Sequence, residues 1–252
     1  MARVLLDDIS VVFPVYTTHA RSLRTAVYSG LGGQLAAHDR MLTVRALHAI
    51  SLDLTDGDRL GLVGPNGAGK TSLLRVISRV YHPAAGLARI DGSVSSFTDI
   101  ALGMDREATG WQNIVLRCVF LGLTFSQARA LSPSIAEFSE LGAFLDLPVR
   151  TYSTGMFVRL AFSISTAVRP DIVVMDEMIG AGDQNFIGKA RQRVGELLDH
   201  SRILVIASHT DDIIRTFCNK VLWLEGGKAR MLGPVDDVLR AYAQAPRPMA
   251  QS

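Results

Sequence analysis

Residues 64–71 read Gly-Pro-Asn-Gly-Ala-Gly-Lys-Thr, and this stretch decides the fold class. It matches the phosphate-binding loop G-x-x-x-x-G-K-S/T, with an apolar strand pattern over residues 60–63 before it and a helical pattern over residues 72–77 after it. Glycines let successive backbone N–H groups turn toward phosphate oxygens at a helix N-terminus, where the helix dipole also favours negative charge. The stretch therefore predicts an α/β protein that binds a nucleoside triphosphate.

Two side chains of this loop carry the expected chemistry. Lys70 supplies a positive charge for the β and γ phosphates, and Thr71 offers a hydroxyl to Mg²⁺, which prefers oxygen ligands. The alternative is a chance glycine-rich turn, which explains neither the flanking patterns nor both side chains. We expect ATP to contact the loop and the residue after it: Gly64, Pro65, Asn66, Gly67, Ala68, Gly69, Lys70, Thr71 and Ser72.

The composition fits one α/β domain with a smaller helical part. The chain has 252 residues, of which 48% are hydrophobic and 20% charged, enough to bury a large core. A net charge of +2, without a long run of lysines and arginines, gives no argument for a nucleic acid partner. Cys118 and Cys218 lie in apolar surroundings without metal-ligand spacing, which favours inert thiols in a reduced cytoplasmic compartment. No apolar stretch is long enough to cross a bilayer, so any membrane role is expected to be peripheral.

The hydrophobic pattern alternates between strands and helices, which predicts a mainly parallel sheet covered on both faces. Residues 111–145 form an inserted helical block, in which Pro133 is expected to delay the start of the second helix to about Ser134. The residues from 243 to 252 are rich in Pro, Ala and Gln and are expected to be frayed. Strand patterns cover residues 1–16, 46–54, 89–97, 171–175, 202–207 and 220–224.

A short amphipathic helix is expected between the first two strands, within residues 19–33. Leu23, Val27 and Leu31 recur there every four residues, before two glycines. An ordinary surface helix and a helix that contacts a membrane surface or a partner account for the pattern equally well.

Polar residues at the ends of two other strands are expected beside the phosphate loop. Asp176 and Glu177 follow one buried strand pattern, and His209 follows the next; the carboxyl ends of parallel strands form the ligand-binding edge of open α/β sheets. We expect Asp176 to hold Mg²⁺ with Thr71, and Glu177 to polarise the water that attacks the γ-phosphate. His209 would hydrogen-bond that phosphate and the water, although alone it would more often be a structural histidine. The other five histidines are interpreted as surface or packing residues.

One more motif, Tyr152-Ser153-Thr154-Gly155-Met156, precedes a helical run and stands between the phosphate loop and Asp176-Glu177. With the motifs in this order, the chain resembles the nucleotide-binding subunit of ABC transporters over nearly its whole length. The motif is similar to the signature of that family, usually Leu-Ser-Gly-Gly-Gln. Ser153 and the backbone around Gly155 make an anion site at a helix N-terminus. The resemblance implies a P-loop NTPase fold with an inserted helical subdomain, and a homodimer in which each signature faces the γ-phosphate on the opposite subunit.

The resemblance implies three further roles. Phe13, with Tyr16 as the alternative, would stack on adenine, although either could equally be a core residue. Asp99 stands near the place where the family has a glutamine, and it is a candidate ligand of Mg²⁺ or water. The loop that crosses to the other subunit would be formed by Ala181, Gly182 and Asp183.

Several features narrow the resemblance to polysaccharide exporters of the O-antigen, capsule and teichoic-acid type. They are the Tyr-Ser-x-Gly-Met form of the signature, the missing glutamine, the extra helix between the first two strands, and the stretches at residues 102–104 and 108–113. This branch implies an ATP-hydrolysing translocase subunit at the cytoplasmic face of the bacterial plasma membrane. Its partners would be an integral membrane permease dimer and, indirectly, a lipid-linked glycan.

The resemblance also implies a domain organisation. Residues 1–242 would form one ATP-binding domain with a helical subdomain at residues 105–168, followed by the tail at residues 243–252. Residues 19–33 would be a gate-like helix near the membrane. Too few residues follow His209 for the C-terminal carbohydrate-binding domain that some relatives carry, so none is expected.

Other functions remain as alternatives. The chain could energise a lipid or drug exporter, or it could be a soluble ABC-type ATPase or a non-catalytic interaction module. Soluble ABC proteins usually need two cassettes or long coiled coils, for which the chain has no room. The presence of every expected catalytic residue, Lys70, Thr71, Asp176, Glu177 and His209, speaks against a module that has lost activity.

Overall fold

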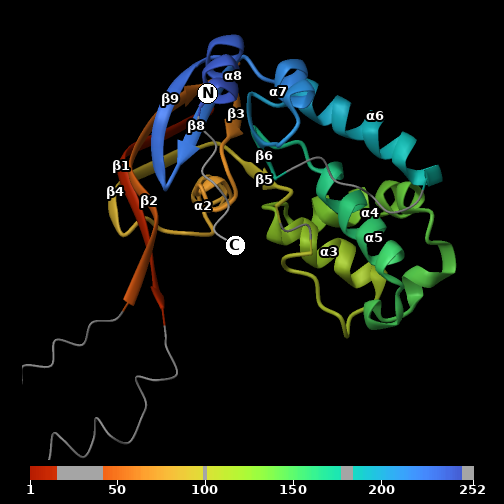
Figure 1. The fold of residues 1–252 in the computed structure, drawn as a ribbon. Helices are drawn as coiled ribbons and strands as arrows, with labels where there is room; N and C mark the ends of the chain where they lie inside the picture. The colour runs from red at the N-terminus through yellow and green to blue at the C-terminus, as the bar shows by residue number, and fades with distance from the viewer. Residues whose placement is uncertain (16–41, 99–100, 177–183, 246–252) are drawn as a thin grey trace, which may run out of the picture.

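A six-stranded sheet forms the centre of the computed structural model, which describes residues 1–15, 42–98, 101–176 and 184–245 (Figure 1). Its order is β5-β6-β7-β3-β8-β9, and neighbouring strands are parallel except for β8 and β9. The carboxyl ends of the parallel strands therefore share one edge. The bounds are β3 (Arg59–Val63), β5 (Val94–Ser96), β6 (Ile172–Asp176), β7 (Ile203–Ala207), β8 (Lys220–Glu225) and β9 (Lys228–Pro234).

A second, antiparallel sheet of three strands has the order β2-β1-β4, with β1 at Arg3–Val15, β2 at Leu42–Thr55 and β4 at Ala85–Asp91. The helix α2 (Lys70–Ile77) packs between the two sheets, where Leu73 and Leu74 are fully buried in a core shared with both (Figure 1). The position of α2 thus depends on both sheets.

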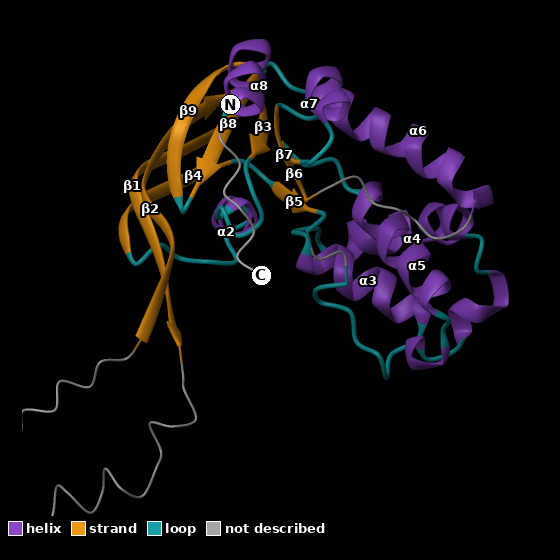
Figure 2. Ribbon diagram, viewed as in Figure 1, coloured by secondary structure: helices purple, strands orange, loops and turns teal. Residues whose placement is uncertain are grey.

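The remaining helices cover the other face of the central sheet or form a lobe beside it (Figure 2). The lobe has its own apolar core and contains α3 (Gly110–Phe120), α4 (Phe125–Ser139), α5 (Thr154–Ala167) and two short 3₁₀ turns at Gly142–Asp146 and Val149–Thr151. The helices α6 (Gln184–His200), α7 (Asp211–Phe217) and α8 (Val235–Gln244) pack on the sheet. No helix in the described ranges is long and apolar enough to span a bilayer.

The expected delay of the second helix at Pro133 is wrong, because α4 runs through this proline. The helix starts with a capping box: Thr124 accepts a hydrogen bond from the Gln127 N–H, and the Gln127 side chain accepts one from the Thr124 N–H. Pro133 lacks the N–H that would bond the fourth residue before it, but Ala128 and Ile135 are fully buried on either side of it. Capping and burial together offset the lost hydrogen bond.

One further expectation needs correction. Residues 89–97 form two strands rather than one, because the chain turns at Gly92 (φ 115°) and places β4 and β5 in different sheets. The strand β9 has no counterpart among the expected strands, and α8 continues to Gln244, beyond the expected boundary at residue 242. The expected helix at residues 19–33 and the last residues of the tail lie outside the described ranges.

Both cysteines fit the expectation of inert thiols. Cys118 is fully buried in the core of the helical lobe, and burial raises the pKa of its thiol to about 11. Burial likewise raises the pKa of the Cys218 thiol to about 12. Both groups are therefore protonated, and so weakly nucleophilic, at neutral pH.

Candidate nucleotide-binding site

The phosphate loop joins the end of β3 to the start of α2 and is pressed against β2. Gly69 caps α2 in a left-handed conformation (φ 103°), and a Cβ atom at this position would lie 2.6 Å from the Ala46 carbonyl oxygen. The Gly69 carbonyl in turn accepts a hydrogen bond of 2.9 Å from the Leu73 N–H. Glycine is required here because both the backbone angle and the close approach exclude a side chain.

Lys70 is held within the loop, with only 9% of its surface exposed. Its Nζ donates hydrogen bonds to the carbonyl oxygens of Gly64 at 2.6 Å and Pro65 at 3.1 Å. Burying an ammonium group is costly unless it is hydrogen-bonded, and these carbonyls offset that cost. The positive charge is thus fixed where the loop is expected to receive phosphates.

Thr71 and Asp176, the two expected Mg²⁺ ligands, meet although 105 residues separate them in the sequence. The Thr71 Oγ1 donates a hydrogen bond of 2.8 Å to the Asp176 Oδ2. Thr71 lies in the first turn of α2, and Asp176 is the last residue of β6. Mg²⁺ is commonly held by one or two protein oxygens together with phosphate oxygens, so this pair fits the ion.

A cleft of about 280 Å³ is lined by residues 66–72, from the phosphate loop and the start of α2, and by side chains expected to act with them. His209, which follows β7, lines the cleft together with Lys70, Thr71 and Asp176, as the shared sheet edge predicted. The neighbouring Ser208 is buried and accepts a hydrogen bond of 3.0 Å from the Thr210 N–H, which fixes the backbone beside His209. The individual roles of these residues remain predictions.

Residues of β2 also line this cleft, although no sequence motif predicted them. Val44 is 56% exposed and Arg45 is also exposed, and both stand beside the loop. Phe13, the expected adenine-stacking residue, pairs with Val44 across β1 and β2 but is absent from the residues that line the cleft. It packs edge-on against Tyr81, with ring centroids 5.2 Å apart. Its role therefore stays a prediction, and Val44 becomes an additional candidate for contact with the base.

The signature segment divides into anchored and exposed residues. Tyr152 and Met156 pack against the core of the helical lobe, and the Tyr152 hydroxyl donates a hydrogen bond of 2.7 Å to the Phe144 carbonyl. Burial raises the pKa of Tyr152. Ser153, Thr154 and Gly155 are exposed at the N-terminus of α5, where the Ser153 Oγ accepts a hydrogen bond of 3.2 Å from the Met156 N–H. The segment therefore presents a capped helix N-terminus to its surroundings.

Several expected site residues lie outside the described ranges. They are Tyr16, Asp99, Glu177, Ala181, Gly182 and Asp183.

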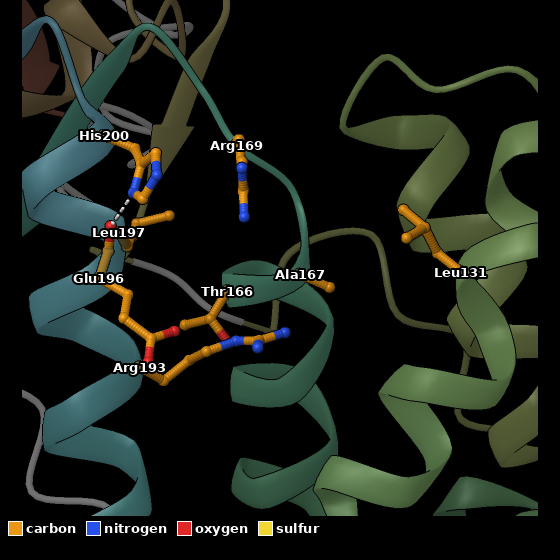
Figure 3. Close-up of a pocket in the computed structure, with 8 residues that line it drawn as sticks. All are labelled: Leu131, Thr166, Ala167, Arg169, Arg193, Glu196, Leu197 and His200. Carbon is orange, nitrogen blue, oxygen red and sulfur yellow. Dashed lines mark hydrogen bonds between the residues drawn. The ribbon is translucent and has the colours of Figure 1, made fainter.

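A separate cavity of about 580 Å³ lies between α4, α5 and α6 and contains none of the expected site residues (Figure 3). His200 lines it, and its Nδ1 lies 2.6 Å from the Glu196 carbonyl oxygen within the last turn of α6. This contact fits the interpretation of His200 as a packing or surface residue.

A glycine loop between a buried strand and a helix, with a lysine, a threonine and a carboxylate from a neighbouring strand, defines a P-loop nucleotide-binding domain. A model of the ABC transporter family matches residues 47–180, more than half of the chain. This chain belongs to the ABC transporter family.

Curated relatives confirm the branch expected from the sequence. The O-antigen export system ATP-binding protein RfbE of Yersinia enterocolitica is 40% identical over 90% of this chain and 96% of its own length. The teichoic acids export ATP-binding protein TagH of Staphylococcus saprophyticus is 40% identical over 79% of this chain and 75% of its own length. The O-antigen export system ATP-binding protein RfbB of Myxococcus xanthus is 33% identical over 97% of this chain, which spans 56% of that protein.

Solved structures confirm the fold. A dimeric post-hydrolysis state of the ATP-binding cassette MJ0796, bound to ADP and Pi, is similar with a TM-score of 0.65, covering 92% of this chain and 98% of that chain. An ATP-binding subunit of an ABC transporter gives a TM-score of 0.67, covering 95% of this chain and 93% of that chain. Both are 18% identical in sequence, so the likeness concerns the fold alone.

Proposed function

We propose that two copies of this chain bind ATP between them and hydrolyse it to drive a separate membrane permease that exports a lipid-linked polysaccharide. The chain works at the cytoplasmic face of the bacterial plasma membrane. The observation that carries the proposal is the meeting of Lys70, Thr71, Asp176 and His209 in one cleft. The 40% identity to an O-antigen export ATP-binding protein over 90% of the chain supports the choice of cargo.

Within one copy, the loop holds the triphosphate for in-line attack by water. The Lys70 ammonium and the loop N–H groups neutralise phosphate oxygens, and Thr71 and Asp176 would hold Mg²⁺. Mg²⁺, when bound, offsets the charge on the phosphates. Glu177 orients the attacking water and accepts its proton, while His209 donates a hydrogen bond to the γ-phosphate. The new O–P bond forms as the β–γ bridging bond breaks, which gives ADP and inorganic phosphate.

The second copy completes the site through its signature segment. The exposed residues Ser153, Thr154 and Gly155 at the N-terminus of α5 can reach a γ-phosphate held by the other copy, because the space around Gly155 is open. ATP thus joins the two copies, and loss of the γ-phosphate removes the contacts that held them. This cycle of closing and opening moves the permease.

The variant Glu177→Gln tests whether two copies of the chain form a dimer with ATP between them. Without the carboxylate that orients water, hydrolysis slows while ATP binding persists, so the variant should form a long-lived dimer with ATP and Mg²⁺. Size-exclusion chromatography with light scattering measures the mass, and ADP in place of ATP is the matched control. A monomer at saturating ATP would refute the composite site.

The cargo requires an experiment in cells. Replacing the chain by Glu177→Gln should block export and leave the lipid-linked glycan on the cytoplasmic side, where extraction and mass spectrometry identify it. Accumulation of a drug or of another membrane lipid instead would assign the chain to a different exporter.

A further inference from the structure

Aromatic side chains from three helices meet where the helical lobe joins the rest of the chain. Phe138 of α4 and Phe162 of α5 lie 5.5 Å and 5.7 Å from Phe186 of α6, measured between ring centroids. The Arg159 guanidinium, on α5, lies over the Phe186 ring at 5.0 Å. With Glu140 and Lys189, these residues form what we call the α4–α5–α6 junction. It connects the helix that begins at the signature to the helix that follows β6 in the chain.

Glu140 occupies a backbone position that suits a different residue. It caps the C-terminus of α4 in a left-handed conformation, with φ 54° and ψ 28°. Glycine or asparagine is usual at such a cap, because a longer side chain is strained there. Backbone preference therefore does not account for a glutamate, and the contacts of its side chain must be considered.

The Glu140 carboxylate reaches both of the other helices. It pairs with Arg159 of α5 at 3.7 Å and with Lys189 of α6. The Arg159 side chain is only 19% exposed, so this pair is less screened by solvent than the exposed pair with Lys189. The carboxylate and the Phe186 ring contact Arg159 together, and they restrict its guanidinium in two directions.

A cavity lies at the other end of the same helices. Toward the C-termini of α5 and α6, a cavity of about 580 Å³ opens between them, with Thr166 and Arg193 on its walls (Figure 3). The Arg193 guanidinium leans over Phe138 at 4.9 Å. At the end nearer the signature, the aromatic rings and the ion pairs of Glu140 join α5 to α6.

Beyond the junction, α6 packs against the central sheet. Phe186 and Val194 share an apolar core with Met175, which precedes Asp176 on β6. A continuous path of packed residues therefore runs from the signature, along α5, through the junction and α6, to the strand that carries the Mg²⁺-binding aspartate.

We propose that Glu140 is a positioning residue that sets the orientation of the signature for ATP-driven pairing, an inference which rests on the proposed function. By holding Arg159 against Phe186, Glu140 fixes the rotation of α5 relative to α6. The exposed residues Ser153 to Gly155 then keep a fixed orientation relative to the sheet and to the phosphate loop. Glu140 touches no nucleotide itself and acts through Arg159.

Glu140→Gly separates this role from a structural one. Glycine relieves the left-handed strain, so the melting temperature should stay unchanged or rise, whereas the link to Arg159 is lost. In a Glu177→Gln background, we expect ATP-driven dimerisation to weaken about fivefold or more, while ATP binding to the single chain stays within about twofold. Glu140→Asp should restore part of the pairing.

Glu137→Gln is the matched control, because Glu137 is exposed one turn earlier on α4 and makes no ion pair with the residues described. It should dimerise like the parent. Unchanged dimerisation of Glu140→Gly would overturn the proposal.

Hydrogen exchange of the single chain gives a second reading that does not need a dimer. Glu140→Gly should speed amide exchange at the start of α5 and leave α2 unchanged, and equal rates at α5 would also overturn the proposal. If Glu177→Gln itself stays monomeric while exchange at α5 rises, the composite site fails and the positioning of α5 by Glu140 stands.

Discussion

The phosphate loop is enclosed by its own chain, whereas the signature segment is open. A Cβ atom on Gly69 would meet the Ala46 carbonyl oxygen at 2.6 Å, but one on Gly155 would meet nothing closer than the Ser153 Oγ at 3.9 Å. Lys70 is buried and bonded to two carbonyls, while Ser153 is exposed and, among the described residues, its side chain bonds within its own helix turn. The described phosphate loop is thus enclosed by its own chain, and the described signature residues face outward.

The two halves also depend on different neighbours. Partners of the phosphate loop come from distant parts of the sequence, such as Ala46 of β2 and Asp176 of β6. In the part of the chain that the structure describes, the Ser153 side chain bonds a residue three positions away. Damage to the phosphate loop should therefore abolish nucleotide binding by a single chain, while damage to the signature should appear only when two chains meet.

The largest effect is expected for Lys70→Ala. It removes the charge that faces the phosphates, so ATP hydrolysis should fall by about 100-fold or more, and ATP binding to the single chain should weaken with it. Phosphate release and isothermal calorimetry measure the two quantities. The exposed Lys228→Ala is the matched control and should keep both values. Nearly full ATP binding by Lys70→Ala would contradict the view that the phosphate loop binds the nucleotide within a single chain.

Alanine substitutions at Gly69 and Gly155 test the contrast between the enclosed phosphate loop and the exposed signature segment. Gly69→Ala must fit a side chain against Ala46 at a left-handed angle, so the free energy of unfolding should fall by about 1–3 kcal/mol. Gly155→Ala lies at an open position on a helix, so stability should stay equal or rise by up to about 1 kcal/mol.

For Gly155→Ala, binding of ATP to the single chain should be unchanged, while hydrolysis falls by about tenfold because the new methyl group displaces the other copy's phosphate. Urea unfolding and steady-state phosphate release measure these effects. A Gly155→Ala protein with full hydrolysis would mean that this segment does not contact ATP.

A part of the site could be predicted from the sequence where its contacts join residues that are close in the sequence or follow a general rule of the fold. The phosphate loop needs its residues in one continuous stretch, so its motif was sufficient. The meeting of Thr71 and Asp176 followed from the rule that parallel strands end at one edge, without knowledge of side-chain positions. Val44 could not be anticipated, because its place beside the loop depends on how β2 pairs with β1 and packs against α2.

The errors have the same origin. Pro133 suggested a helix start, but the capping box at Thr124 and the burial of Ile135 outweigh one missing hydrogen bond. Residues 89–97 were predicted as one strand with Asp91-Gly92 inside it, although this dipeptide favours a turn, and the packing of β4 and β5 in different sheets decides for the turn. Each case is a competition between a local preference and distant packing.

The smallest effect on stability is expected at the start of β6, the strand that ends in Asp176 beside the phosphate loop. Asp171 precedes β6, and its Oδ2 accepts hydrogen bonds from the Ser93 N–H at 2.9 Å and the Ser93 hydroxyl at 2.8 Å. The Arg202 Nε lies 3.1 Å from its Oδ1. The hydrogen bonds from Ser93, and then the charge of Arg202, hold the pKa of Asp171 below its usual value.

Because the pKa is lower in the folded chain, ionised Asp171 stabilises the fold above its unfolded pKa of about 3.9, and this contribution is lost as the pH falls through the folded value. Asp171→Asn should therefore lower the free energy of unfolding at pH 7 and lower it by less in acid. Urea unfolding from about pH 7 to pH 3 measures the difference, with the exposed Asp199→Asn as the control substitution. If Asp171→Asn lowers the free energy of unfolding by the same amount in acid as at neutral pH, the carboxylate charge does not anchor β6.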